Sequence, residues 1–216
     1  EVFSRLSGEQ RMIESASSPW PVSIMTVSSI ISVDPPSLFV SRNFNPQQPS
    51  KYDGHFRLRV REALRSTSAA PSLFTPLELD GTIYCDGAIF ANNPSSIAYH
   101  ESTRLYPGVP VELFVSIGCG ITESRKVGQE GWGGVIKQIV GSAVDTQRVH
   151  ETLSDFLTEP PYFRFDPIMP KEWPIDVTDP AVLKQYKAIA KAYFAQPEQQ
   201  QRLSCLSDIL RGNATT

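Results

Sequence analysis

Residues 65–94 read RSTSAAPSLFTPLELDGTIYCDGAIFANNP, and the predicted fold is organised around this stretch. A helix over residues 57–66 enters it and ends before Pro71, because proline lacks a backbone donor and restricts the residue before it. The crowded small residues at its start indicate a backbone that packs closely against another segment. Residues 82–85 (TIYC) are β-branched and aromatic, which is typical of a strand. The stretch therefore predicts a helix, a turn and a strand in succession.

One carboxylate, Asp86, is predicted to lie at the end of this strand, directly before Gly87. Glycine permits backbone conformations that other residues avoid, and α/β folds place functional groups at strand ends. Asp-Gly is also a very common turn pair, so from this pair alone a simple turn aspartate is the more frequent explanation. Asn92-Asn93-Pro94 then predicts another helix, with Asn93 as its cap and Pro94 in its first turn.

Outside this stretch, apolar runs alternate with turn signals and predict further strands and helices. The predicted strands are residues 22–33, 37–43, 111–117 and 162–165, and the first two are expected to pair antiparallel. Residues 111–117 are apolar at almost every position, which predicts a buried strand covered on both faces. The predicted helices are residues 94–105, 135–157, 180–195 and 197–211. This alternation predicts an α/β architecture.

Length and composition describe a globular chain without signs of nucleic acid binding. With 216 residues, 40% of them hydrophobic and 20% charged, the sequence is long enough for one sizeable domain. The net charge of −3 gives no reason to expect a nucleic acid partner. No apolar run reaches membrane-spanning length, and no targeting segment is visible.

The three cysteines, Cys85, Cys119 and Cys205, are widely spaced and form neither a disulfide framework nor a metal-binding pattern. We expect free thiols, buried at Cys85 and Cys119, and an intracellular, reducing compartment.

Several motifs together resemble the patatin-like phospholipase family. Residues 67–71 (TSAAP) with Phe74, Asp86-Gly87-Ala88 and Asn92-Asn93-Pro94 are similar to the family's second conserved block. Residues 115–120 (VSIGCG) resemble its next strand and Gly-rich turn, with Cys119 where threonine is more usual. Similarity to the calcium-independent phospholipase A2-gamma branch extends from about residue 22 to 211 and includes Tyr99-His100-Glu101, Val144-Asp145-Thr146, Tyr162-Phe163-Arg164-Phe165 and Pro167.

The resemblance implies a fold, a reaction and a substrate. The fold is a three-layer α/β/α sandwich, of which this chain holds the C-terminal portion: a core of about 1–120 and a helical extension of about 130–212. The reaction is lipid acyl hydrolysis by a Ser-Asp dyad, in which Asp86 accepts the serine proton. The residues that support this motif are Gly87, Ala88, Asn92 and Asn93.

The same resemblance implies a phospholipid or other acyl-ester lipid as substrate, met at a membrane surface, with no cofactor, no metal and no nucleic acid partner. The location it implies is intracellular and peripheral to mitochondrial, peroxisomal or endoplasmic reticulum membranes.

The family's serine motif, Gly-x-Ser-x-Gly, does not occur in the sequence. Ser142 and Ser116 have the nearest surroundings, but neither lies between two correctly spaced glycines. Since the chain begins at Glu1, we expect the serine and the oxyanion loop to lie upstream of residue 1. The alternative is a non-catalytic module that keeps the fold and binds lipid or protein.

The remaining polar candidates are assigned structural roles. A Ser-His-Asp triad would need a histidine near Asp86, but the three histidines are scattered and surface or capping roles are favoured; they are His55, His100 and His150. Three further aspartates are interpreted as caps or turn residues, and no spacing suggests a metal site; they are Asp34, Asp53 and Asp176.

Overall fold

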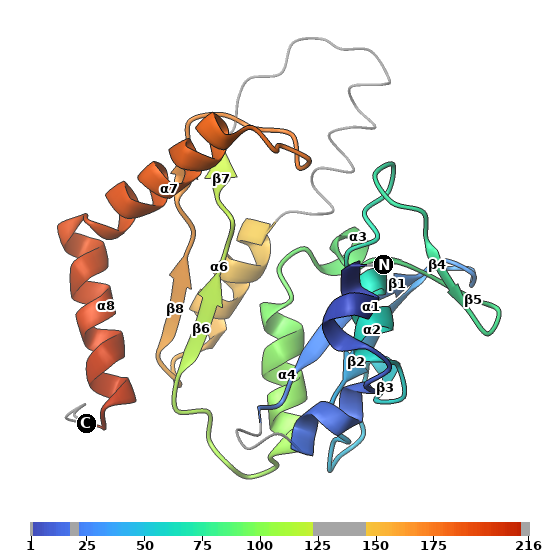
Figure 1. The fold of residues 1–216 in the computed structure, drawn as a ribbon. Helices are drawn as coiled ribbons and strands as arrows, with labels where there is room; N and C mark the ends of the chain where they lie inside the picture. Colours follow the sequence, from blue (N-terminus) through green and yellow to red (C-terminus); the bar gives the residue numbers. More distant parts are fainter. Residues whose placement is uncertain (1, 18–21, 123–145, 213–216) are drawn as a thin grey trace. The chain divides into compact units, whose positions relative to one another are not determined.

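The computed structural model describes residues 2–17, 22–122 and 146–212, and the chain divides into two compact units (Figure 1). Unit 1 comprises Glu1–Val111 and Glu130–Asp155, and unit 2 comprises Glu112–Gln129 and Phe156–Thr216. The predicted division into a core and a C-terminal helical extension stays a prediction.

Unit 1 is built on a mixed five-stranded sheet in the order β3-β2-β1-β5-β4. The predicted antiparallel pairing of the first two strands is confirmed, with Val27 opposite Val40. The Asp80-Gly81 pair joins the last two strands with φ values of 49° and 77°, the left-handed conformation that two-residue hairpin turns favour. The strands are β1 (Met25–Ile30), β2 (Ser37–Arg42), β3 (Asp53–His55), β4 (Leu77–Leu79) and β5 (Thr82–Asp86).

Helices cover both faces of this sheet, so unit 1 has three α/β/α layers and the expected fold class is confirmed (Figure 1). On one face, Ile97 packs against Val27 and Val40. On the opposite face, the hydroxyl of Ser28 donates to the hydroxyl of Ser66 over 2.9 Å. The described helices of this unit are α1 (Val2–Ser7), η1 (Met12–Ser17), α2 (Val60–Thr67), α3 (Ala88–Ala91), α4 (Ser95–Leu105) and α6 (Thr146–Phe156, whose last residue is assigned to unit 2).

The described residues of unit 2 form two small parallel sheets and two helices. Strand β6 (Phe114–Ile117) pairs with β8 (Tyr162–Phe165), and β7 (Ile121–Thr122) pairs with β9 (Ile168–Met169). The predicted C-terminal helices are confirmed as α7 (Pro180–Phe194) and α8 (Pro197–Leu210). Asp179 caps α7, since its Oδ1 accepts a bond of 2.8 Å from the Ala181 amide.

Two predictions of burial in unit 2 are wrong. Strand β6 begins only at Phe114, and Ile117 and Val115 are 77% and 38% exposed. Within the described ranges this strand has one neighbour, β8, so its other edge and part of its surface lack cover. Cys119 is also exposed, because it lies in the turn after β6 and not in the sheet.

Other predictions have mixed outcomes. Cys85 is buried and free, as predicted. The helix expected from residue 57 begins at Val60, and the short helix α3 was not predicted. Residues 135–145, including the candidate Ser142, lie outside the described residues. None of the described helices is both long enough and apolar enough to cross a lipid bilayer.

Candidate active site

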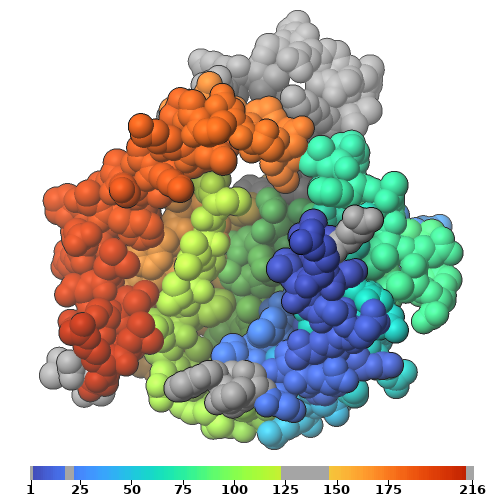
Figure 2. Space-filling view, viewed as in Figure 1, coloured from blue at the N-terminus to red at the C-terminus, as the bar shows by residue number. Residues whose placement is uncertain are grey.

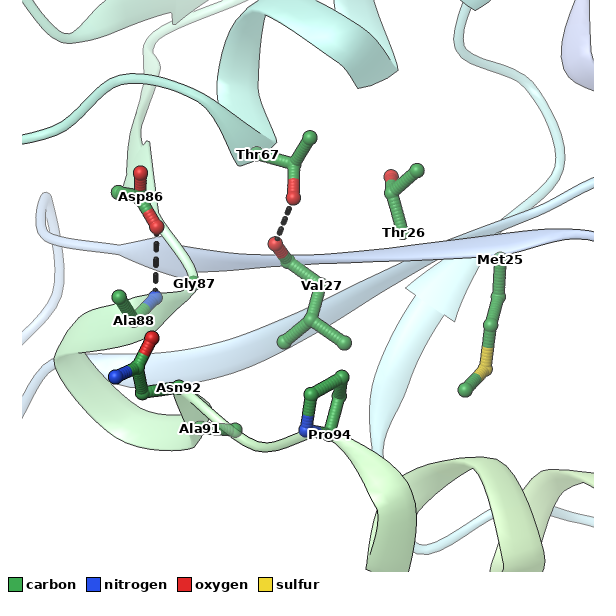
Figure 3. Close-up of a pocket in the computed structure, with 10 residues that line it drawn as sticks. All are labelled: Met25, Thr26, Val27, Thr67, Asp86, Gly87, Ala88, Ala91, Asn92 and Pro94. Carbon is green, nitrogen blue, oxygen red and sulfur yellow. Dashed lines mark hydrogen bonds between the residues drawn. The ribbon is translucent and has the colours of Figure 1, made fainter. Parts of the chain in front are cut away.

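Asp86 is the last residue of β5 and lies opposite Ser28 of β1. In the described part of the chain, β1 continues past the end of β5, so residues 25–27 have no strand beside them on this side. A cavity of about 290 Å³ occupies the space next to this unpaired end of β1. Figure 3 shows Asp86, Thr67 and Thr26 on one side of the strand, and Ala91 and Pro94 on the other.

Hydrogen bonds hold Asp86 in place on three sides. Its backbone amide donates to the Ala69 carbonyl over 3.1 Å, and its carbonyl accepts a bond of 2.8 Å from the Ser29 hydroxyl. The carboxylate Oδ1 accepts a bond of 2.8 Å from the Ala88 amide at the start of α3. Among the described residues no donor binds Oδ2, so one carboxylate oxygen is fixed and the other is available.

Gly87 is required at its position, but not for the predicted reason. Its φ is −66°, an ordinary helical value, so the expectation of an unusual backbone conformation is wrong. A Cβ at this position would lie 2.3 Å from the Val27 carbonyl oxygen, far inside van der Waals contact. Glycine is needed because the backbone after Asp86 packs directly against β1.

The Val27 carbonyl is also where Thr67 binds. The Thr67 hydroxyl donates to this oxygen over 2.6 Å (Figure 3). It thereby supplies a hydrogen-bond donor to β1 at a position that lies beyond the end of β5. Sequence patterns alone predict no role for this residue, because its partner lies 40 positions away.

The crowded small residues of the TSAAP motif were expected to pack closely, and this expectation is confirmed. Ala69 is fully buried, and its carbonyl accepts from both Asp86 and the Cys85 thiol.

The two motif asparagines have different positions. Asn92 lines the cavity beside Ala91 and Pro94. Asn93 is buried, and its Oδ1 accepts a bond of 3.2 Å from the Ser95 amide. The prediction that Asn93 caps this helix and that Pro94 lies in its first turn is wrong by one residue, because Pro94 itself occupies the N-cap position. Helix α4 begins at Ser95, and Pro94 precedes it.

The described alternative candidates do not line the Asp86 cavity. Ser116 belongs to unit 2, and its hydroxyl accepts a bond of 2.7 Å from Arg164. His55 accepts from the Arg57 amide, and burial together with the charge of Arg57 lowers the pKa of its ring. His100 accepts from the Lys51 amide, and burial and that lysine lower its pKa.

His150 lies within 3.3 Å of the Ser154 hydroxyl on α6. Within the described ranges, no three His, Cys, Asp or Glu side chains gather closely enough to hold a metal ion.

Comparison with known proteins identifies related chains. Residues 30–99 match the family model described as patatin-like phospholipase, and this range includes Asp86 and seven of the ten residues that line its cavity. The chain is 31% identical over 222 residues to calcium-independent phospholipase A2-gamma of Oryctolagus cuniculus, an alignment that covers 100% of this chain and 28% of that protein. It is 34% identical over 215 residues to the Homo sapiens protein of the same name, covering 97% and 27%. It is also 31% identical over 225 residues to phospholipase A I of Arabidopsis thaliana, covering 87% and 17%.

The layered sheet and these matches agree, and the chain belongs to the patatin-like phospholipase family. Within that family, its similarity to calcium-independent phospholipase A2-gamma runs through units 1 and 2 alike. The chain spans less than a third of the length of these relatives.

Proposed function

We propose that the protein containing this chain is a phospholipase A-type lipid acyl hydrolase, in which Asp86 is the proton acceptor of a Ser-Asp dyad. Its substrate is a phospholipid or another acyl-ester lipid, met at a membrane surface. The observation that carries the proposal is the state of the Asp86 carboxylate. One oxygen is fixed by the Ala88 amide, while the other has no donor among the described residues and borders a cavity.

In this reaction, a carboxylate activates a serine hydroxyl, which is a weak nucleophile by itself. As the serine Oγ bonds to the ester carbonyl carbon, its proton passes to Asp86; the departing alcohol then takes this proton. Water then attacks the acyl-enzyme with the same proton transfers through Asp86, which releases the fatty acid and restores the serine. The proposal takes the nucleophile from outside these 216 residues, because none of their serines lies in a Gly-x-Ser-x-Gly motif.

The backbone around Asp86 suits this role. Because the bonds to Ala69, Ser29 and Ala88 fix both the strand end and the carboxylate, little freedom is lost when a serine binds the second oxygen.

The test is Asp86→Asn in the full-length protein. Asparagine keeps the size of aspartate and can still accept the bond from the Ala88 amide, but it cannot act as a base. We expect kcat for phospholipid hydrolysis to fall by roughly 10³-fold or more, with a melting temperature near that of the wild type.

A matched control is Asp179→Asn. Like Asp86, Asp179 accepts a 2.8 Å bond from the amide two positions later, but it lies in unit 2 and does not line the Asp86 cavity. This control should keep full activity. If Asp86→Asn were as active as the control, the assignment of Asp86 would be wrong. If the wild type bound lipid without hydrolysing it, the non-catalytic alternative would replace the proposal.

A further inference from the structure

The segment between α2 and β4 forms an exposed, uncharged loop beside the candidate active site. No residue between Arg65 and Glu78 carries a charge. All residues of 71–76, here called the interfacial loop, are exposed. At its tip Leu73 is 41% exposed and Phe74 is 57% exposed. Large apolar side chains at the tip of an uncharged loop indicate a surface that meets an apolar partner.

Hydrogen bonds give the interfacial loop a defined shape. The amides of Leu73 and Phe74 both donate to the Ala70 carbonyl, over 3.1 and 3.0 Å. Arg65 donates through Nη2 to the Thr75 carbonyl at the far end of the loop. The apolar tip is therefore presented without further ordering, which lowers the entropic cost of binding.

Arg65 adds a positive charge at the base of this loop. Its guanidinium lies 5.6 Å from the centre of the Phe74 ring. In the described part of the chain, no carboxylate lies within ion-pair distance of Arg65, and its Nη1 is buried without a hydrogen-bond partner. An apolar tip next to a cation that has no paired carboxylate complements a bilayer surface, where acyl chains lie beneath a layer of phosphates.

The interfacial loop is attached to the candidate active site. It begins directly after Ala69 and Ala70, and the Ala69 carbonyl accepts from the Asp86 amide over 3.1 Å. On the other side of Asp86, helix α3 presents Phe90, which is 44% exposed. Figure 1 shows the loop extending away from the sheet beside α3, and Figure 2 shows it on the surface of unit 1 in turquoise.

We propose that the interfacial loop docks unit 1 onto a phospholipid bilayer, with Leu73 and Phe74 entering the interface and Arg65 attracted to lipid phosphate. This inference rests on the proposed lipid hydrolase function, and it adds how the Asp86 cavity is brought to its substrate. Membrane contact through this loop holds the cavity within reach of lipid that never leaves the bilayer.

The test measures vesicle binding by the full-length protein and by three sets of variants. Sedimentation with mixed phosphatidylcholine and phosphatidylglycerol vesicles gives the partition coefficient. We expect the double variant Leu73→Ser with Phe74→Ser to lower it roughly tenfold or more, because most of the apolar contact is lost. Arg65→Gln should lower it about fivefold, and by less on phosphatidylcholine alone.

The matched control is Ile31→Ser with Val33→Ser. These side chains are 38% and 47% exposed, and Ile31 bonds to Ile83, near the start of β5 and not at its Asp86 end. The control should change partition by about twofold at most, as for ordinary surface substitutions.

Hydrolysis of a soluble nitrophenyl ester separates this inference from the proposed function. If the wild type hydrolyses this ester and the loop variant binds vesicles as well as the wild type, the inference is wrong and the function stands. If the wild type binds vesicles through the loop but hydrolyses nothing, the function is wrong and the docking surface stands. If the loop variant loses soluble-ester hydrolysis together with binding, the loop supports the site and the docking proposal is overturned.

A second variant guards against misfolding of the double mutant. In Phe74→Trp, the added tryptophan should shift its emission to shorter wavelength when vesicles are added, relative to the wild-type protein. If the difference spectrum does not shift, the loop tip stays in water and the docking proposal is wrong. This is the result expected if the loop binds a protein partner instead of a bilayer.

Discussion

At the scale of single residues, Asp86 and Gly87 act as one unit because each depends on the backbone of β1. Asp86 ends β5 opposite Ser28, and Gly87 then passes so close to the Val27 carbonyl that a side chain has no room. The same carbonyl accepts from Thr67. The direction of the Asp86 carboxylate is therefore set by main-chain packing as well as by its own hydrogen bonds.

Gly87→Ala tests this close packing. The added Cβ would lie 2.3 Å from backbone oxygen that belongs to a central strand and cannot easily move. We expect a loss of about 1–3 kcal/mol in the free energy of unfolding, together with loss of hydrolysis. Chemical denaturation of the full-length protein measures the first, and phospholipid turnover the second.

Gly108→Ala is the comparison variant. Gly108 has a φ of +80°, but nothing lies within 4 Å of the position that a Cβ would take, so this variant reports backbone strain without steric conflict. That strain should cost about 1 kcal/mol and leave hydrolysis intact. Equal stability and activity of the two variants would contradict the packing argument for Gly87.

At the scale of elements, a buried ion pair joins β2 to α4. Arg42 and Glu101 have side chains only 3% and 2% exposed, and their closest atoms are 2.6 Å apart. Ser50 donates to the same carboxylate, and Arg42 also donates to the Tyr52 carbonyl, so the pair secures the loop before β3. Burial alone raises the pKa of Glu101, but these hydrogen bonds and the charge of Arg42 hold that pKa below its ordinary value.

Glu101→Gln should destabilise the protein by about 3–5 kcal/mol, because it leaves the Arg42 charge buried without a counter-charge. Since the pKa of Glu101 is lowered by folding, its stabilising effect is present above its ordinary value of 4.5 and is lost as pH falls through the lower folded value. Urea denaturation at several pH values should therefore show the wild type and the variant converging below about pH 4.5.

Glu62→Gln provides the contrast for this ion pair. Glu62 pairs with Arg59, whose side chain is 40% exposed, and glutamine can still accept the bond from the Arg59 amide. Its cost should be about 1 kcal/mol or less. A similar cost for both variants, or a Glu101 effect that persists unchanged in acid, would contradict the proposed role of the buried pair.

At the scale of the whole molecule, the 216 residues hold the proposed acceptor carboxylate and a layered sheet, but no Gly-x-Ser-x-Gly motif. Under the proposed mechanism, Asp86 therefore lacks the motif serine that it would activate. In unit 2, β6 presents Ile117 at 77% exposure on a sheet of two strands. Uncovered apolar strands favour association between chains.

The chain of residues 1–216 alone should therefore be inactive and poorly stable. We expect no hydrolysis of a short-chain nitrophenyl ester and no labelling by a serine-reactive inhibitor, whereas the full-length protein shows both. Near-UV circular dichroism and light scattering should reveal weak tertiary packing and aggregation. A soluble, cooperatively melting and inhibitor-sensitive esterase would contradict both expectations, and would make Ser142 and Ser116 the candidates for the nucleophile.

The sequence by itself determined the elements whose signals are local. Strands β1 and β2 follow from short β-branched and apolar runs on either side of a Pro-rich turn, and their pairing follows from the short connection. Helix α7 follows from Asp179 and Pro180, which cap and start it. The position of Asp86 at a strand end was predicted in the same way, because strand and turn residues adjoin it.

Only the tertiary structure decided what depends on contacts between distant residues. The partner of Thr67 lies 40 positions away, and Glu101 lies 59 positions from Arg42. Because these separations are large, no periodic pattern in the sequence predicts either hydrogen bond. The steric need for Gly87 and the exposure of β6 have the same origin, since both depend on which backbone lies alongside. Local propensity is a property of neighbouring residues, whereas burial and close contact are properties of the packed chain, and this is why the sequence located the carboxylate and the fold supplied its surroundings.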